Sequence, residues 1–220
     1  HGGVDKKELG TENLEALAKG IKNLEKHIEN IAKYNLPSVV AINAFPTDSE
    51  AELQLLKDTC NKMGVDVAIS KVWEKGADGG IELAEKLLEI LDTKEANYQP
   101  LYDLNLSIKE KIETIAKEIY GADGVAFDKK VLTKMKKYEA QGLADLPICV
   151  AKTQYSLSDQ PTLLGRPRGF TIKINDLIPS AGAGFLVAIS GSIMRMPGLP
   201  KRPAAVNMDI DKDGKIVGLF

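Results

Sequence analysis

Two short apolar runs, each flanked by segments with helical periodicity, constrain the fold of this chain more than any other feature. In residues 11–34 the apolar side chains recur every three or four positions, which predicts an amphipathic helix. Residues 38–43 and 65–70 are rich in Val, Ile and Ala and predict buried strands, with further helices over 47–63 and 79–91. Helices that alternate with strands through short joints are typical of a parallel, Rossmann-like α/β layer.

The pattern changes beyond this layer. Residues 92–99 are polar and aperiodic, and helical periodicity returns over residues 107–120 and 128–141. After Gly142, connectors rich in Gly and Pro separate apolar runs that predict strands at residues 147–151, 169–174, 184–189, 204–210 and 215–219. We therefore expect an α/β fold in two parts: a parallel α/β layer over residues 1–95 and a smaller α+β region over residues 96–220.

The charge balance and the cysteines bear on partners and compartment. Lys and Arg total 29 against 31 Asp and Glu, a net charge of −2, which gives no electrostatic signature for nucleic acid or an anionic membrane surface. No apolar run reaches the roughly 18 residues that a membrane-spanning helix needs, and no signal peptide opens the sequence. Cys60 and Cys149 stand apart in apolar segments, which favours reduced, structural thiols and a cytoplasmic protein.

Residues 209–214, Asp-Ile-Asp-Lys-Asp-Gly, copy the first half of a calcium-binding loop. Such a loop needs a bidentate Glu at its twelfth position, which is Phe220 here, and no helical pattern flanks it. The alternative is a hairpin in which Asp213 and Gly214 form the turn. We predict the turn and no metal site.

A second glycine-rich stretch covers residues 75–80 and lies between a predicted strand and a predicted helix. Backbone N–H groups at a helix start can bind an anion. The spacing matches neither the dinucleotide fingerprint nor the phosphate loop, so nucleotide binding is not supported. A tight turn explains the glycines equally well.

Two aromatic side chains follow the two predicted parallel strands at the point where each strand ends. Phe45, next to Pro46, follows the first strand, and Trp73, the sole tryptophan, follows the second. Ligands of open α/β sheets bind outside the carboxyl ends of the strands. The two rings are therefore candidates for stacking a flat heterocycle, and the alternative is that both cover the edge of the core.

Assemblies of catalytic side chains are absent from the sequence. The only histidines are His1 and His27, and His27 lies on a helix among charged residues, where we expect it to be solvated. No Ser-His-Asp set, Cys-His pair or zinc-type cysteine cluster can be assembled. The segment 152–158 offers hydroxyl groups after a strand, which by itself indicates only a polar loop.

Several longer strings carry a family resemblance. Residues 146–158, Leu-Pro-Ile-Cys-Val-Ala-Lys-Thr-Gln-Tyr-Ser-Leu-Ser, resemble a signature of the formate–tetrahydrofolate ligases. The shorter strings that also match are Val72-Trp73, Lys75-Gly76, Tyr120-Gly121-Ala122-Asp123, residues 180–186, residues 196–200 and Gly218-Leu219-Phe220. The matches run in order along the whole chain, so the resemblance is specific to the C-terminal portion of that family.

The resemblance implies an activity and a set of binding residues. Members of the family are cytoplasmic enzymes of one-carbon metabolism, commonly homotetramers, that join formate to tetrahydrofolate with ATP and Mg²⁺ through formyl phosphate. By resemblance, the pterin ring lies between Phe45 and Trp73. The expected folate contacts are Phe45, Pro46, Ile69, Trp73, Lys75 and Gly76, and the expected residues on the nucleotide side are Met196, Pro197 and Gly198.

The resemblance also implies that a part of the enzyme is missing. The family's phosphate loop and the basic groups that hold formyl phosphate lie upstream of anything in this chain, which therefore carries no catalytic residue of its own. His1-Gly2-Gly3 matches the family, so we expect a fragment; a deliberately shortened, tagged chain is the alternative. We expect no ligase activity without a phosphate cradle, at most weak folate binding, and the last strands to pack on the absent nucleotide portion.

Two other functions remain open from the residues alone. A non-catalytic α/β binding or interaction module would explain the missing catalytic groups without a lost portion. An acyl-activating ligase of other specificity would share the architecture but not the pterin. The aromatic pair discriminates among these, because a pterin site needs Phe45 and Trp73 to face one another across an open cleft.

Overall fold

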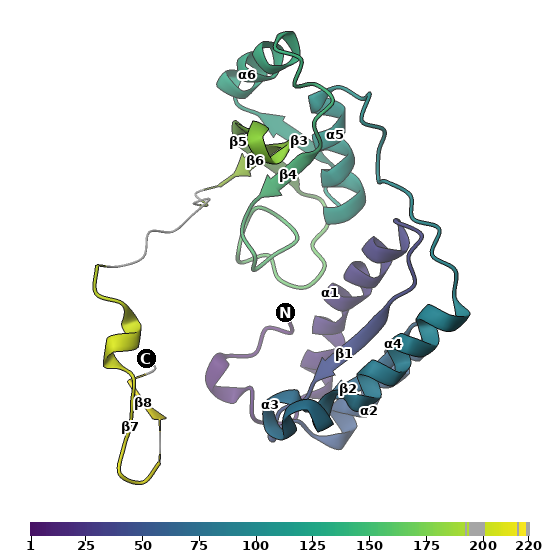
Figure 1. Cartoon of the computed structure of the whole chain (residues 1–220), viewed down its shortest axis with the longest axis vertical. Helices are drawn as coiled ribbons and strands as arrows, with labels where there is room; N and C mark the ends of the chain where they lie inside the picture. Colours follow the sequence, from purple (N-terminus) through teal and green to yellow (C-terminus); the bar gives the residue numbers. More distant parts are fainter. Residues whose placement is uncertain (192, 194–200, 215, 219–220) are drawn as a thin grey trace.

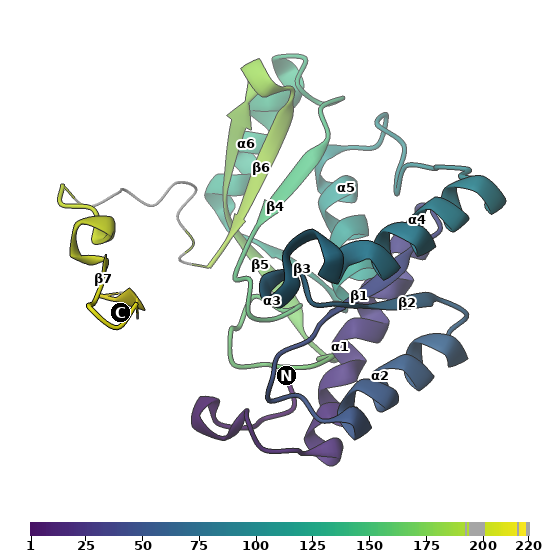
Figure 2. The same cartoon turned by 60° about the horizontal axis from the view of Figure 1, so that its bottom comes forward.

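The computed structural model describes residues 1–191, 193, 201–214 and 216–218. The first part of the chain forms a layer in which two parallel strands, β1 (Val39–Asn43) and β2 (Asp66–Ser70), pair in register from Val39 opposite Asp66 to Asn43 opposite Ser70. Helices α1 (Leu14–Ala32) and α2 (Glu50–Lys62) cover one face of these strands, and α4 (Ile81–Thr93) covers the other (Figure 2). The parallel α/β layer predicted from the sequence is confirmed.

Local signals in the sequence explain where these elements begin and end. Ser49 and Glu52 form a reciprocal capping box at the start of α2, which satisfies two backbone N–H groups that the helix leaves free. Gly64 follows the helix with φ at 69°, a conformation that glycine adopts without strain. A buried cluster of Ile42, Ala44, Leu53, Cys60 and Val67 fills the space between α2 and the strands.

The second part of the chain builds a mixed four-stranded sheet. Its strands are β3 (Gly124–Phe127), β4 (Ile148–Ala151), β5 (Thr171–Ser180) and β6 (Phe185–Ser190), in the spatial order β3-β5-β6-β4. The outer pairs β3–β5 and β4–β6 are parallel, and the central pair β5–β6 is antiparallel. Helix α5 (Ile108–Ile115), which continues as a π-helical turn (Ala116–Tyr120), and helix α6 (Lys129–Ala140) pack on it (Figure 1).

Strand predictions in this part were less accurate than helix predictions. Strand β3 was not predicted, because it has only four residues and they are half-buried or exposed, so the sequence shows no clear periodicity there. The strand predicted over residues 169–174 is β5, which continues to Ser180 past a register shift between Ile174 and Asp176. A β-bulge accommodates the polar pair Asn175-Asp176 that interrupts the apolar run.

The C-terminal strands are also shorter than predicted. A 3₁₀ turn (Ala204–Asn207) occupies most of the run predicted as a strand over 204–210, where the backbone after Pro203 turns instead of extending. Only β7 (Asp209–Ile210) remains extended, and it pairs with β8 (Ile216–Val217). Of the strand predicted over 215–219, residues 216–217 form β8, and residues 215 and 219 lie outside the described residues.

Helix α1 joins the two parts of the chain. The Lys26 ammonium donates to the carbonyl oxygen of Glu118 at 2.7 Å, and the amide of Asn30 donates to the carbonyl oxygen of Ile119 at 2.9 Å. Both acceptors lie at the carboxyl end of the α5 segment, where backbone carbonyls have no partner within the helix. Polar side chains of α1 thus cap a helix of the other part. Of the helices described, none is long and apolar enough to cross a membrane.

Candidate functional site

Phe45 and Trp73 lie beside one another at the carboxyl ends of β1 and β2. Their ring centroids are 5.9 Å apart and the ring planes are inclined by 23°, so the rings are stacked on each other. Phe45 is 54% exposed and Trp73 is 51% exposed. Neither ring is part of the buried core, which argues against the alternative that they only cover the edge of the sheet.

The Trp73 side of this pair is held by the turn that carries it. Trp73 belongs to the one-turn helix α3 (Val72–Lys75), and its indole Nε1 donates to the carbonyl oxygen of Ala44 at 2.7 Å. The turn closes where the Lys71 N–H donates to the carbonyl oxygen of Gly79 at 2.9 Å. A Cβ atom on Gly79 would lie 2.3 Å from the Lys71 carbonyl oxygen, so only glycine fits this closure. The glycine-rich stretch therefore has a structural role in placing Trp73.

The Phe45 side is held through its backbone. The Phe45 N–H donates to Asp48 Oδ2 at 2.8 Å, and the Asp48 N–H donates back to the Phe45 carbonyl oxygen at 3.0 Å. The preceding residue, Ala44, donates its N–H to the carbonyl oxygen of Ser70 at 3.1 Å, which ties the loop to β2. The loop from β1 to α2 is thus anchored at both ends of Phe45.

A family model described as formate–tetrahydrofolate ligase matches residues 1–220, the whole of this sequence. The chain belongs to the formate–tetrahydrofolate ligase family. The resemblance seen in the sequence motifs is confirmed. The family consists of ligases of one-carbon metabolism, and its substrates include ATP and tetrahydrofolate.

The other residues expected to contact folate differ in how exposed they are. Pro46 follows Phe45 and is exposed, and Lys75 and Gly76 lie on the exposed turn that carries Trp73. Ile69 is half-buried in β2 opposite Ile42 and packs on the core cluster. The three residues expected on the nucleotide side, Met196, Pro197 and Gly198, lie outside the described residues.

A hollow of about 530 Å³ adjoins the end of β1. Apolar side chains of α1 and α2, including Leu17, Ile21, Leu24, Leu53 and Leu56, line it together with the first residues of the chain. Asn43, Asp48 and Glu52 supply polar groups. Sequence reasoning missed this hollow, because no local pattern records that two helices and an N-terminal segment stand apart in space.

The family signature over residues 146–158 contains strand β4 and, after it, a loop organised around Lys152. The Lys152 ammonium donates to the carbonyl oxygens of Thr153 at 3.0 Å, Ser158 at 2.9 Å and Ser156, and it lies 4.7 Å from the centroid of the Tyr120 ring. Burial lowers the pKa of Lys152 to about 8, while the three carbonyl acceptors favour the ammonium form. Burial also raises the pKa of Tyr120 to about 12. The sequence indicated only a polar loop here, whereas the structure shows that hydrogen bonds from Lys152 hold the loop together.

His27 projects from α1 toward the same loop. It lines a hollow of about 250 Å³ together with Tyr120, Lys152 and Thr153. The side chain is exposed, as the sequence predicted, although partial burial and the charges of Lys152 and Lys26 hold its pKa below the usual range. The lowered pKa favours the uncharged form of the His27 imidazole.

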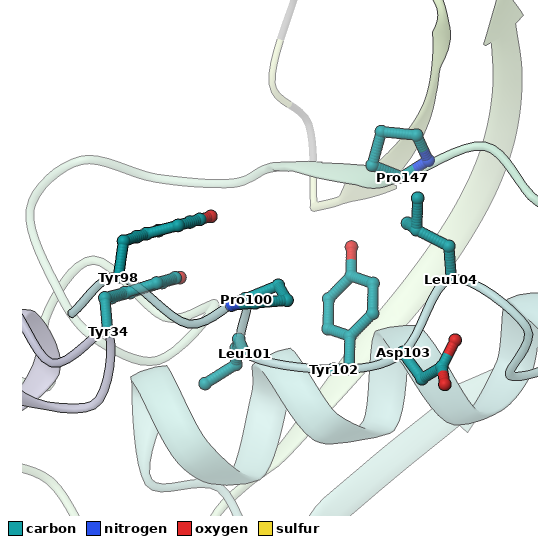
Figure 3. Close-up of a pocket in the computed structure, with 8 residues that line it drawn as sticks. All are labelled: Tyr34, Tyr98, Pro100, Leu101, Tyr102, Asp103, Leu104 and Pro147. Carbon is teal, nitrogen blue, oxygen red and sulfur yellow. The ribbon is translucent and has the colours of Figure 1, made fainter.

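A third hollow, of about 750 Å³, lies along the connector between the two parts of the chain (Figure 3). Tyr34 and Tyr98 stack there with ring centroids 6.1 Å apart and planes inclined by 2°. The Tyr102 hydroxyl accepts a hydrogen bond of 3.0 Å from the Ile148 N–H, and the Gln99 N–H donates to the Tyr34 carbonyl oxygen at 3.1 Å. These contacts fasten the connector to both parts of the chain.

The region that resembled a calcium loop is a hairpin turn. Gly214 has φ at 77° and donates its N–H to the carbonyl oxygen of Asp211 at 3.0 Å, between strands β7 and β8. The predicted turn is confirmed. Among the residues that the structure describes, no group of three or more His, Cys, Asp or Glu side chains could hold a metal ion.

Proposed function

We propose that this chain supplies the folate-binding wall of a formate–tetrahydrofolate ligase, with the pterin ring held between Phe45 and Trp73. The observation that carries the proposal is the placement of two exposed rings, stacked on each other, at the carboxyl ends of adjacent parallel strands. That edge is where open α/β sheets bind ligands. Stacking a flat heterocycle on an aromatic ring contributes about 1 kcal/mol beyond the burial of its area.

In the proposed reaction, a formate oxygen attacks the γ-phosphorus of ATP and releases ADP, which leaves formyl phosphate. The N10 amine of tetrahydrofolate then attacks the formyl carbon, the bond from that carbon to the phosphate oxygen breaks, and the amine loses its proton. The products are 10-formyltetrahydrofolate and phosphate. In this scheme Phe45 and Trp73 bind and orient the pterin, Pro46 and Ile69 form a nearby apolar wall, and Lys75 and Gly76 border the site.

ATP and its Mg²⁺ need a cradle for the phosphates and oxygen ligands for the cation. The residues that the structure describes offer no cluster of carboxylates for a divalent cation, and the turn at residues 76–80 is closed on Lys71 rather than open to a phosphate. We propose that a nucleotide-binding portion outside this chain supplies those groups. The chain alone is then inactive as a ligase and binds folate weakly.

The free edge of β1 supports the proposal that a separate portion binds the nucleotide. Parallel sheets are covered on both faces and extended by several strands, whereas β1 pairs with β2 alone among the described residues. Because α1 and α2 share one face of the sheet, right-handed crossovers would place a strand preceding α1 beside the free edge of β1. We propose that the nucleotide-binding portion contributes such a strand. On this view residues 1–95 carry the folate site, and the last strands of residues 96–220 pack on that portion.

A cytoplasmic homo-oligomer is part of the same proposal. The near-neutral charge of −2 supports small-molecule substrates rather than nucleic acid or a membrane surface as partners. A non-catalytic interaction module would use the exposed ring pair for protein contacts instead. Folate binding at the ring pair would favour the ligase function over the interaction module.

The test is a titration of the 220-residue chain with tetrahydrofolate in anaerobic, reducing buffer, followed by tryptophan emission. Trp73 is the sole tryptophan, so a change in emission reports on this site. We expect saturable quenching that is lost in Phe45→Ala and retained in Tyr155→Ala, which removes an exposed aromatic ring from another loop. A folded chain that shows no quenching at millimolar tetrahydrofolate would contradict the proposed folate wall.

A further inference from the structure

The ring pair is closed in the free chain. A flat heterocycle between two rings needs a ring separation of about 7 Å, because each aromatic contact takes about 3.5 Å. The Phe45 and Trp73 rings are stacked with centroids 5.9 Å apart, which is less than this separation. A pterin can enter only if one of the two rings moves aside.

The hydrogen bonds show which ring is free to move. The Trp73 indole is fixed by its bond to the Ala44 carbonyl oxygen and by the closed turn from Lys71 to Gly79. The Phe45 ring has no polar atom and is 54% exposed, so no hydrogen bond restrains its side-chain torsions. Trp73 is thus the fixed wall of the pair, and the Phe45 side chain is the movable one.

The Phe45 backbone, in contrast, is restrained on both sides by one residue. Asp48 accepts from the Phe45 N–H at 2.8 Å and donates its own N–H to the Phe45 carbonyl oxygen at 3.0 Å. Ala44 is restrained in the same way, by Ser70 at its N–H and by Trp73 at its carbonyl oxygen. All four backbone polar groups of Ala44 and Phe45 are therefore occupied, and motion is confined to the Phe45 side chain.

We propose that Asp48 is a positioning residue for the stacking site, because its carboxylate fixes the Phe45 backbone so that the ring opens and closes over Trp73 about a fixed pivot. This role rests on the proposed function of the ring pair. Without the Asp48 acceptor, the loop would gain backbone freedom that ligand binding must remove again. The ring would also cover Trp73 for a smaller share of the time.

Three variants test this role. In Asp48→Ala the Phe45 N–H loses its acceptor, and we expect about five- to tenfold weaker binding of tetrahydrofolate, which corresponds to the net value of about one hydrogen bond. Asp48→Asn keeps an oxygen acceptor and should bind within about twofold of the unmodified chain. Asp58→Ala removes the same charge from the exposed face of α2, where the Gln54 amide donates to Asp58 Oδ1 at 2.8 Å, and should leave the affinity unchanged.

A second readout needs no ligand. In free Asp48→Ala, the Trp73 emission should shift to longer wavelength because water reaches the ring face that Phe45 covers, and the shift should be absent in Asp48→Asn and Asp58→Ala. Thermal unfolding followed by circular dichroism verifies that the three variants are folded. A merely structural role of Asp48 would lower the melting temperature without moving the Trp73 emission of the folded protein.

The outcomes separate this inference from the proposed function. If the unmodified chain binds tetrahydrofolate and Asp48→Ala binds it equally well, Asp48 has no positioning role and the folate wall stands. The role is likewise excluded if Asp48→Asn binds as weakly as Asp48→Ala. If the unmodified chain does not bind tetrahydrofolate, the proposed function fails, and the Trp73 emission of the free variants still decides whether Asp48 holds Phe45.

Discussion

The indole N–H of Trp73 donates a hydrogen bond of 2.7 Å to the carbonyl oxygen of Ala44, the residue directly before Phe45. This bond joins the loops that follow two parallel strands, so each ring of the stacked pair depends on the loop of the other. Ala44 is buried and its N–H is bonded to Ser70 of β2, which makes it a fixed reference for both loops.

Replacing Trp73 by Phe tests the importance of this bond. Trp73→Phe keeps an aromatic face but removes the donor, so the ring loses its fixed orientation. We expect about fivefold weaker binding of tetrahydrofolate, which corresponds to the roughly 1 kcal/mol net value of one hydrogen bond. Because the variant contains no tryptophan, isothermal titration calorimetry is the appropriate measurement. Equal affinity of the two proteins would show that only the ring face matters.

Gly79 provides a test of the turn that carries Trp73. In Gly79→Ala the new Cβ would lie 2.3 Å from the Lys71 carbonyl oxygen, so the backbone must shift. We expect a loss of about 1–3 kcal/mol in the free energy of unfolding, as for other overpacked sites, and a changed near-ultraviolet signal from Trp73.

The neighbouring glycine is the matched control. In Gly80→Ala the nearest contact would be Val72 Cγ2 at 3.1 Å, a side-chain atom that can move away. Urea unfolding of both variants should therefore show a clearly smaller loss for Gly80→Ala. Equal losses would indicate that both changes act through the start of α4 rather than through the Lys71 carbonyl.

Lys111 is a fully buried cation, 0% exposed, in the core of the second part of the chain. Its ammonium donates to the carbonyl oxygens of Ala144 at 2.6 Å and Leu146 at 3.3 Å. Lys111→Met leaves both carbonyl groups without this donor, and we expect a loss of about 1–3 kcal/mol in the free energy of unfolding. Lys109→Met, on the exposed side of the same helix, should change it by less than about 0.5 kcal/mol. An unchanged free energy of unfolding in Lys111→Met would mean that apolar packing offsets the lost hydrogen bonds.

The contact between Glu29 of α1 and Arg166 predicts a pH-dependent stability. The guanidinium donates to both carboxylate oxygens, at 2.7 and 2.6 Å, and its hydrogen bonds hold the pKa of Glu29 below the ordinary 4.5. A carboxylate with a lowered pKa in the folded state stabilises the fold above its unfolded pKa, and this contribution disappears as the pH falls through the folded pKa. The side chains of Arg166 and Glu29 are 23% and 41% exposed, so solvent screens the pair.

We therefore expect Arg166→Gln to lower the free energy of unfolding by about 0.5–1 kcal/mol near pH 7, and by much less near pH 3. Urea unfolding at both pH values measures the difference. Lys22→Gln, which removes an exposed ion pair with Glu25 on the same helix, serves as the control and should have little effect at either pH. A loss of equal size at both pH values would show that Arg166 acts through packing and not through Glu29.

The amino-acid sequence by itself determined the regular elements of the first part of the chain. Helical periodicity and capping residues are local properties, so α1, α2, β1, β2 and α4 were predicted within a few residues of their ends. The strand order also follows from local signals, because short α/β joints and right-handed crossovers leave few alternatives. From that order alone, Phe45 and Trp73 were expected at one edge of the sheet.

Only the tertiary structure decided how these side chains meet. The 5.9 Å separation of the rings, the bond from Trp73 to Ala44 and the two bonds between Asp48 and Phe45 are not recorded in any periodicity. The half-buried strand β3 was missed, and the strand predicted over residues 204–210 was wrong over residues 204–207, for a related reason. Strand formation depends on a partner that is distant in sequence, whereas a helix satisfies its hydrogen bonds within its own segment, so helices are encoded locally and strand pairing and site geometry are not.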